Sequence, residues 1–459
     1  MKTNKMVMMA LVAAAMCVVP MKVGAQDADS AKIYTLNGCM KYAVENSPTV
    51  KKQKYLNDNY RANRDEALAS MFPSLSGSSS ATTSYGRNVD PETNTYTTTA
   101  TFGNSYSLYS EMLVFHGFSA INSYRSSRVG VLMGKSDLDQ AKDQTALDVM
   151  QAFFDFVFYA DAVEIARKQC EASRETYVRD STEETLGMKD TSDVLQVEAQ
   201  VRSDEYTLVK QENARDLAMA TLKQKMNYPS DKDLQIDTNV TFSDMTAAEY
   251  SSGLPSMEEV MGYSLKNNPR IRSAEYGLNK SRLDYAAAKG KLFPSIYVGA
   301  GLNSAYYENL GSTVQASSFM EQLKNNEGQY LGVSISIPIF DGLSYKSAAR
   351  RARNTMKIAE QTDEETKRTV ANEIAQNYGQ MKGFEKEYAQ TLKKVEAAET
   401  AYRAEQEKYL QGVSSPIELQ TAANLLLQAR SENLNARLQY MIKYRLMQYY
   451  AGRPLISEQ

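Results

Sequence analysis

Apolar residues fall on every second position in two stretches of the chain, and small polar residues fill the positions between them. The first stretch follows Pro294 and has the apolar positions Ile296, Val298, Ala300 and Leu302. The second has the apolar positions Leu331, Val333, Ile335, Ile337 and Ile339. A period of two is typical of a strand with one buried face. The pattern therefore predicts two strands and the turn between them.

The same pattern begins earlier in the chain, at a second Phe-Pro-Ser sequence. Phe72-Pro73 and Phe293-Pro294 are 294 − 73 = 221 residues apart. Further along, the offset becomes 225, since Gly117 matches Gly342 and Gly187 matches Gly412. Similarity at a fixed offset indicates a repeat. We predict repeats at 26–227 and 257–452, a connecting segment at 228–256 and a C-terminal tail at 453–459.

Long helices account for most of each predicted repeat. No credible break occurs between Gly117 and Gly187, or between Gly342 and Gly412. Each run is about 68 residues, or roughly 100 Å of helix at 1.5 Å per residue. We expect shorter helices at 38–71, 191–227, 257–292 and 416–451, stacked in pairs alongside the long ones. Gly187 and Gly412 then mark turns at the far tip.

The last predicted helix is apolar on two sides. Ala422, Ala429 and Ala436 recur at intervals of seven. Leu427, Leu434, Leu438 and Met441 form a second stripe on nearly the opposite side, at 100° per residue. A helix of this kind has a neighbour on each side, as in a wall of helices. The alternative is a bundle in which one mixed face meets solvent.

The alternating strands are long enough to cross a bilayer when tilted, which takes about 9–11 residues. Lipid-facing strands must form a closed barrel, because an open edge leaves backbone groups unpaired in lipid. Four strands cannot close alone, so several copies would share one barrel. Proline ends the preceding helix, and Phe72 and Phe293 suit a membrane interface. The alternative is an ordinary sheet whose apolar face covers a core.

The N-terminus has the features of a secretory signal. Lys2 and Lys5 precede an apolar run, and Val23-Gly24-Ala25 resembles a cleavage site, which predicts a signal peptide at 1–25. Removal of this segment takes away Lys2, Lys5 and Lys22, so the formal net charge changes from −3 to −6. No basic cluster suggests a nucleic-acid partner. The exported chain keeps Cys39 and Cys170, which could pair, although two buried thiols are favoured.

The residue inventory does not favour an enzyme. His116 is the single histidine, and the repeat places Asp341 at its equivalent position. His116 is therefore interpreted as a residue at the corner between strand and helix. No phosphate loop, metal-spaced Cys or His set, or nucleophile elbow appears, so we expect no cofactor and no metal.

In the order and spacing of its motifs, the chain resembles the TolC-like outer-membrane efflux proteins. The motifs are the two Phe-Pro-Ser junctions, "PIFDG" at 338–342, "GMKDTSDVLQVEAQ" from Gly187 and "GVSSPIELQTAAN" from Gly412. The resemblance implies a mainly α fold with β strands. It further implies that a duplicated coiled-coil α-barrel joins four membrane strands per chain, and that a homotrimer shares a 12-stranded β-barrel. Segments 228–256 and 453–459 would form a belt around the tunnel.

The resemblance also implies the function: an outer-membrane exit duct for efflux or type I secretion, opened by an inner-membrane pump and a periplasmic adaptor. An alternative from another class is a soluble exported coiled-coil scaffold or adhesin, with the hairpins as small tip sheets. We expect the adaptor to dock at the two turns, on Gly187, Met188, Gly412 and Val413. Gly117 and Gly342 would form the corners between strand and helix.

Members of this family close the tunnel near the helical turns. The matching positions here are Tyr409, an inward acid at Glu418, and the partner pair Ser192 and Asp193. The chain departs from the pattern at Ser414, where some members have Arg, and at Thr421, where some have a second acid. Asp193 and Glu418 also suit a simpler interpretation, in which they complement the dipole at helix N-termini.

Overall fold

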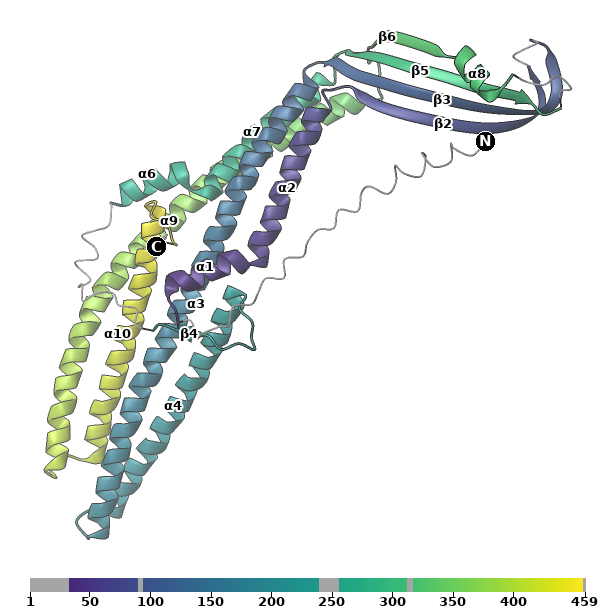
Figure 1. Ribbon diagram of the computed structural model, residues 1–459. Helices are drawn as coiled ribbons and strands as arrows, with labels where there is room; N and C mark the ends of the chain where they lie inside the picture. Colours follow the sequence, from purple (N-terminus) through teal and green to yellow (C-terminus); the bar gives the residue numbers. More distant parts are fainter. Residues whose placement is uncertain (1–32, 90–93, 239–255, 312–316, 457–459) are drawn as a thin grey trace.

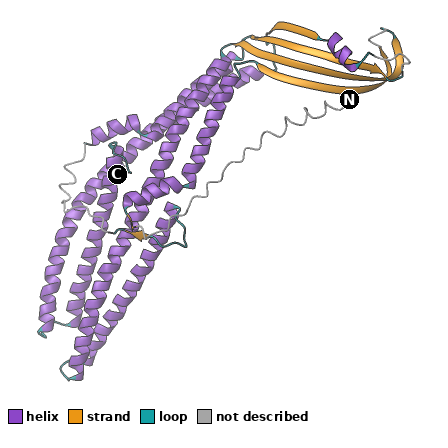
Figure 2. Ribbon diagram, in the orientation of Figure 1, coloured by secondary structure: helices purple, strands orange, loops and turns teal. Residues whose placement is uncertain are grey.

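A computed structural model describes residues 33–89, 94–238, 256–311 and 317–456. The predicted signal peptide lies outside these residues. An elongated body of helices carries a four-stranded sheet at one end (Figure 1). Helices form the elongated body and the two turns at its lower end. The strands lie at the opposite end, apart from one small pair (Figure 2). None of the helices in the described ranges is long and apolar enough to be a membrane span.

The two predicted long helices are confirmed. α3 (Ser119–Thr185) and α9 (Ser344–Leu410) have 67 residues each, or roughly 100 Å. Each turns back at the tip into a shorter helix, α4 (Thr191–Met226) or α10 (Pro416–Tyr450). The repeat is therefore visible in the structure as two antiparallel helix pairs.

The predicted single helices at 38–71 and 257–292 are wrong, because each is two helices. α1 (Leu36–Asn46) is followed by α2 (Pro48–Ala69), and α6 (Met257–Asn267) by α7 (Pro269–Gly290). Proline has no N–H to continue a helix but is well suited to its first position. The Ser47 hydroxyl caps α2 by accepting from Val50 N, and the Asn268 amide caps α7 by accepting from Arg270 N.

The four long strands form one antiparallel sheet in the order β2-β3-β5-β6. Their bounds are β2 (Ser74–Val89), β3 (Tyr96–His116), β5 (Ser295–Asn309) and β6 (Gly328–Ser336). The two hairpins join through β3 and β5 and are not isolated pairs. β6 ends before the predicted Ile337 and Ile339, because β5 begins at Ser295 and its first residue pairs with Ser336.

Two small elements were not predicted. Helix α8 (Phe319–Asn325) lies beside β5, beyond the end of β6. Its Gln322 amide bonds both the N–H and the C=O of Tyr307, which replaces the missing strand partner there. The second element is a parallel pair of β1 (Ile33–Tyr34) and β4 (Gln235–Ile236).

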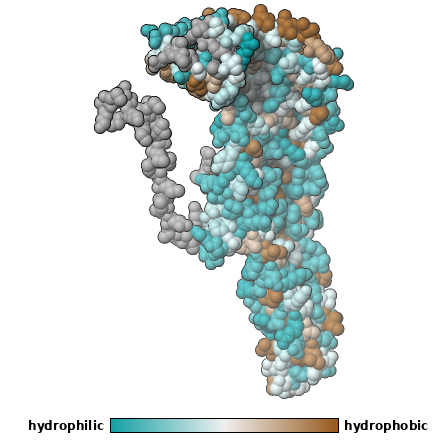
Figure 3. Space-filling model, turned by 90° about the vertical axis from the view of Figure 1, so that its right-hand side faces the viewer, coloured by the Kyte–Doolittle hydropathy of each residue, from teal (hydrophilic) through white to brown (hydrophobic). Residues whose placement is uncertain are grey.

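The predicted apolar face of the sheet is confirmed by its register. Ile296 lies opposite Ile335, and Val298 lies opposite Val333. Ser334, on the other face, lies opposite Tyr297. Leu331 is 79% exposed and Ile335 64% exposed, so nothing in the described chain covers this face. Figure 3 shows hydrophobic side chains gathered at the top of the molecule, over the sheet.

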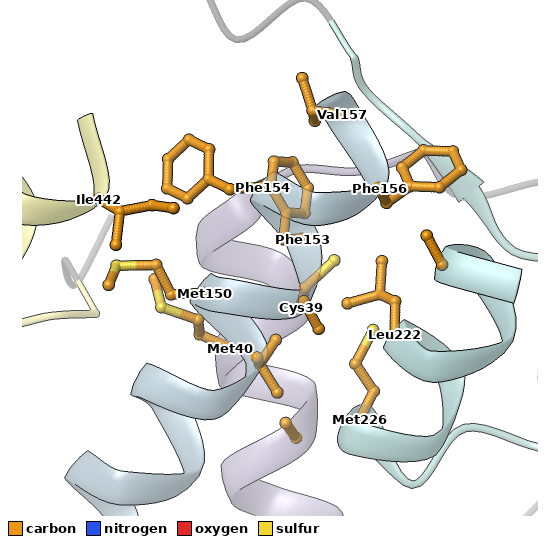
Figure 4. Close-up of a cluster of buried hydrophobic side chains, with 14 of the residues drawn as sticks. Cys39, Met40, Met150, Phe153, Phe154, Phe156, Val157, Leu222, Met226 and Ile442 are labelled. Carbon is orange, nitrogen blue, oxygen red and sulfur yellow. The ribbon is translucent and has the colours of Figure 1, made fainter. Parts of the chain in front are cut away.

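The largest core lies around the middle of the helices. Phe153 and Phe154 of α3 meet Met40 of α1 and Leu222 of α4 there (Figure 4). Ile236 of β4 and Ile456 of the C-terminal tail pack against the same cluster. The connecting segment and the tail therefore meet at mid-height of the helices.

Both cysteines of the exported chain are free and buried, as favoured. Burial raises the pKa of the Cys39 thiol to about 12, so it stays protonated. The two-sided packing of α10 is also confirmed. Ala429 and Ala436 are fully buried, Leu434 and Leu438 nearly so, and α10 contacts α9 as well as α3.

Candidate functional site at the helical tips

Each long helix ends in the same turn. Gly187 and Gly412 have φ of 72° and 73°, a conformation that favours glycine. Met188 N bonds to Glu183 O at 2.8 Å, and Val413 N bonds to Lys408 O at 3.0 Å. These are Schellman turns, which satisfy the last carbonyls of a helix. Met188 and Val413 are 76% and 75% exposed, so each turn presents one apolar side chain to solvent.

The returning helices are capped by polar side chains that follow the turns. The Asp190 carboxylate accepts from Ser192 N at 3.1 Å and starts α4. At α10, Ser415 and Glu418 form a capping box, in which each side chain bonds the other's backbone N–H. Hydrogen bonds from Ser415 N–H and from the Ser414 hydroxyl lower the pKa of the Glu418 carboxyl.

A buried polar cluster joins the two repeats just above the turns. The Tyr409 hydroxyl of α9 donates to Asp180 Oδ2 of α3 and accepts from Lys189 Nζ at 2.7 Å. Lys189 Nζ also lies 2.9 Å from Asp180 Oδ2. Asp180 is 0% exposed and Tyr409 is 5% exposed. We call Asp180, Lys189 and Tyr409, with Arg179, the tip cluster.

Cations complete the tip cluster. Arg179 Nη2 donates to Asp180 Oδ1 at 2.9 Å, so both oxygens of the buried carboxylate have charged donors. Lys189 Nζ lies 4.1 Å from the centre of the Tyr409 ring, within cation–π range. Burial raises the pKa of the Tyr409 phenol, and the hydrogen bond to Asp180 raises it further. The hydroxyl therefore keeps the proton that it donates.

The second repeat has a weaker version of this cluster. At offset 225, Asp180 corresponds to Glu405 and Lys189 corresponds to Ser414. The Ser414 hydroxyl donates to Glu405 Oε1 in place of the Lys189 ammonium, and Lys408 Nζ of the same helix lies 3.0 Å from Glu405 Oε2. The pKa of the Glu405 carboxyl is lowered by Ser414 and then by Lys408.

A second polar link lies closer to the middle of the tip helices. Gln420 Nε2 of α10 donates to Gln200 Oε1 of α4. Gln200 Nε2 donates in turn to Asp204 Oδ1 at 2.7 Å. Asp204 is 4% exposed, and burial raises the pKa of its carboxyl. The two helix pairs are thus joined by polar contacts over several turns.

At the opposite end of the helices, the junctions lie where they were predicted. β2 and β5 begin immediately after Pro73 and Pro294, and Phe72 and Phe293 are exposed. Gly117 and Gly342, with φ of 53° and 64°, form the corners before α3 and α9. A Cβ on Gly117 would lie 2.9 Å from Gly290 Cα, so this corner requires glycine on both sides.

Comparison with known proteins supports this arrangement. The sequence profile described as "Outer membrane efflux protein" matches residues 40–227 and 260–452, which are the two repeats. The chain belongs to the outer membrane efflux protein family.

Similar proteins include one named for secretion and one named for efflux. The alkaline protease secretion protein AprF of Pseudomonas aeruginosa is 20% identical over 339 residues, 73% of this chain and 67% of that protein. The probable efflux pump outer membrane protein TtgC of Pseudomonas putida is 24% identical over 392 residues, 83% of this chain and 75% of that one. The efflux protein is therefore assigned to the outer membrane, spanning into the periplasm, and the soluble scaffold is set aside.

Solved structures share its fold. CusC superposes with a TM-score of 0.77 at 16% identity, over 91% of this chain and 92% of that one. VceC of Vibrio cholerae superposes with a TM-score of 0.76 at 14% identity, over 91% and 96%. The helix–strand arrangement of the efflux protein is thus that of known outer-membrane channels.

The predicted gate residues of the efflux protein all lie at the tips, but their contacts differ from the prediction. Tyr409 bonds Asp180 and Lys189, where Ser192 and Asp193 were the expected partners. Glu418 serves as a helix cap, and Ser192 lies in the exposed first turn of α4. Asp193 contributes its charge near the Tyr409 hydroxyl.

Sequence reasoning missed Asp180 and Lys189, although a signal was present. The family pattern led to a search for a cation two residues after the second turn glycine, at Ser414. The internal repeat places an equivalent position two residues after the first turn glycine, and that position is Lys189.

Proposed function

We propose that three copies of this chain form one outer-membrane duct, closed at its periplasmic tip and opened by an adaptor of an inner-membrane pump. The carrying observation is the sheet, which has one exposed apolar face. In the described chain, the outer edges of β2 and β6 have no strand partner. In lipid these edges must be paired, and pairing β6 of one copy with β2 of the next closes a barrel.

The internal repeat supplies the register of this proposed contact. Within the chain, Ser110 of β3 lies opposite Ala300 of β5. The repeat equivalent of Ser110 is 110 + 225 = 335, and that of Ala300 is 300 − 221 = 79. Ile335 of one copy should therefore lie opposite Ser79 of the next. The two side chains would then share the lipid-facing side of the sheet.

Cysteine crosslinking tests this register. Ser79→Cys with Ile335→Cys, in a chain with Cys39→Ser and Cys170→Ser, should give covalent dimers and trimers upon oxidation in the outer membrane. Directly opposite residues have Cβ atoms about 4.5–5.5 Å apart, within reach of a disulfide. The matched control is Ser79→Cys with Leu331→Cys, four residues before Ile335 in β6. Monomers alone, or equal crosslinking of both pairs, would contradict the proposed barrel.

The tip cluster supports a closed resting state. It holds α9 of the second repeat against α3 of the first through a buried carboxylate with three charged or hydroxyl donors. We place Tyr409 and Asp193 in this contact, and Ser192 and Glu418 at the exposed rim beside it. Opening then requires the contact between α3 and α9 to break. Three copies around one axis would multiply its stabilising effect.

The two exposed turns are the proposed docking surface of the adaptor. Gly187 and Gly412 shape them, and Met188 and Val413 supply the apolar side chains that a partner would cover. A single small turn binds weakly, and threefold repetition adds avidity.

We assign no catalytic step to the protein, since His116 is the last residue of β3 at the corner before α3.

Substitution of both turn residues tests the docking surface. Met188→Asp with Val413→Asp should abolish export and leave trimers intact, because a charged turn cannot be buried against an apolar surface. The matched control is Leu217→Asp, which changes an exposed residue of α4 away from the turns. Normal export by the double variant would place docking elsewhere.

A further inference from the structure

Two bulky apolar residues occupy an unfavourable backbone conformation where the strands end and the long helices begin. Phe118 has φ of 62° and Leu343 has φ of 65°, in the left-handed region that disfavours side chains with a Cβ. They are repeat equivalents, since 118 + 225 = 343. Both are also largely exposed, at 63% and 55%. Packing within the described chain therefore does not explain why these positions are not glycine.

The Phe118 ring lies on the side of the corner that continues the apolar face of the sheet. Its centre is 5.4 Å from the ring of Phe115, in an edge-to-face arrangement. Phe115 lies opposite Ile296, a residue of the apolar face. Phe118 therefore extends the lipid-facing surface past the last strand residue and onto the start of α3.

Arginines follow each of these residues at the same spacing. Arg125 and Arg128 come seven and ten residues after Phe118, and Arg350 and Arg353 come seven and ten residues after Leu343. All four are exposed. None of the four makes a hydrogen bond or ion pair with another residue in the described ranges. This basic surface is not apparent in the sequence, because its members are divided between the repeats.

The first arginine pair is exposed although α3 already has a neighbouring helix on each side. α3 already packs against both α2 and α7 at this height. Ser126 is buried and donates to Asp284 of α7, and Gly130 is buried beside Tyr60 of α2. Arg125 and Arg128 thus remain free with both flanking helices in place. A second copy of the chain is not needed to complete their surroundings.

We infer that Phe118, Arg125 and Arg128, with their equivalents Leu343, Arg350 and Arg353, form a collar that binds anionic phospholipids of the periplasmic leaflet. This inference rests on the proposed membrane position of the sheet. Seven and ten helical residues rise about 10 and 15 Å, which is beyond a headgroup layer about 5–8 Å thick. With Phe118 at the edge of the acyl chains, the arginine side chains lean toward the helix N-terminus and so reach back toward the phosphates. Guanidinium groups bind phosphate through paired hydrogen bonds.

The absence of tryptophan from the sequence allows a direct test. Phe118→Trp places a single fluorophore in the collar of the full-length protein. The trimer is reconstituted in vesicles of phosphatidylcholine and phosphatidylglycerol, with one lipid brominated at a time. We expect quenching by both lipids, with about a fivefold preference for the anionic one, since each arginine near a headgroup favours it to that extent.

Matched arginine variants test the second half of the inference. Arg125→Gln with Arg128→Gln should reduce the preference to near one. Arg368→Gln with Arg403→Gln makes the same charge change lower on α9 and should leave it unchanged. Leu343→Trp with Arg350→Gln and Arg353→Gln repeats the test in the second repeat. A preference that survives in both glutamine variants would overturn the lipid assignment, as would its loss in excess inorganic phosphate.

A third fluorophore separates this inference from the proposed function. Leu108→Trp lies in the middle of β3 on the apolar face. If Leu108→Trp is quenched and neither Phe118→Trp nor Leu343→Trp is, the sheet is in the membrane and the collar is wrong. If none of the three is quenched, the membrane position of the sheet itself is wrong, and the collar with it.

Discussion

The two helical tips, at Gly187 in the first repeat and Gly412 in the second, have the same backbone conformation and different side-chain contacts. Both end in a Schellman turn and a capped helix, and both have an acid seven residues before the turn glycine. At the first tip this acid is Asp180, buried with Lys189 and Arg179 and joined to Tyr409 of the other repeat. At the second tip it is Glu405, bonded by the Ser414 hydroxyl. A duplicated scaffold thus carries one strong contact and one weak contact.

Under the proposed function, this difference predicts where the duct would open. The strong contact lies inside one chain, between α3 and α9. In the proposed trimer, the equivalent of Tyr409 at the boundary between copies is 409 − 225, or Glu184, which cannot donate to Glu405 when ionised. In the proposed trimer, the boundary between copies would therefore be the weaker side of each tip, and the tip cluster would resist opening within each chain.

Removal of the buried acid should have the largest effect. Asp180→Ala leaves Lys189 and Arg179 without their carboxylate, and loss of one partner from a buried ion pair costs about 3–5 kcal/mol. We expect a several-fold rise in single-channel conductance in planar bilayers, and sensitivity of cells to large antibiotics such as vancomycin. Glu405→Ala is the matched variant at the second tip and should change both measurements much less. Equal effects would remove the distinction between the tips.

Removal of one hydroxyl should have an intermediate effect. Tyr409→Phe keeps the ring and its cation–π contact and deletes the hydrogen bond to Asp180, which contributes about 1.5–3 kcal/mol. Conductance should rise by less than in Asp180→Ala, and the double variant should add little, since both changes break one contact. Tyr402→Phe, seven residues earlier on α9, is the control. An additive double variant would show that Tyr409 acts through another partner.

Transfer of the cation to the second tip should have the smallest effect. Ser414→Lys puts an ammonium beside Glu405 and Glu418, in the position that Lys189 has at the first tip. Exposed ion pairs stabilise little, so we expect conductance to fall by less than about twofold, and less at high salt. Ser414→Gln supplies a similar length without charge. A change of the same size in Ser414→Gln would mean that bulk, not charge, closes the second tip.

The large features of the fold were predictable because each rests on local chemistry. The turn glycines, the Phe-Pro-Ser junctions and the offset of 225 are all present in short segments of sequence. The side chains that share the apolar face of the sheet were predictable from the period of two along each strand. The break between α1 and α2 was also local, at Pro48, and was missed because a helical pattern continues on both sides of it.

The tip cluster depended on tertiary structure. Asp180 has the same hydropathy as any solvent-facing acid of α3, and its burial depends on α9 approaching from the other repeat. Helix α8 was missed for a similar reason, because Gln322 is helical only beside the unpaired end of β5. Partners distant in sequence determined both features, and of these residues only Lys189 had a signal in the sequence, through its place in the repeat.

The close crossing of Gly117 and Gly290 has a consequence for symmetry. The same crossing at the second corner would bring Gly342 against position 290 − 221, which is Ala69 of a neighbouring copy. Ala69 carries a methyl group that Gly290 lacks, so the backbones cannot approach as closely there. Six corners around the ring would then alternate between tight and wide. The assembled ring would have threefold and not sixfold symmetry. It would deform most easily at the wide corners, where two separate polypeptides meet.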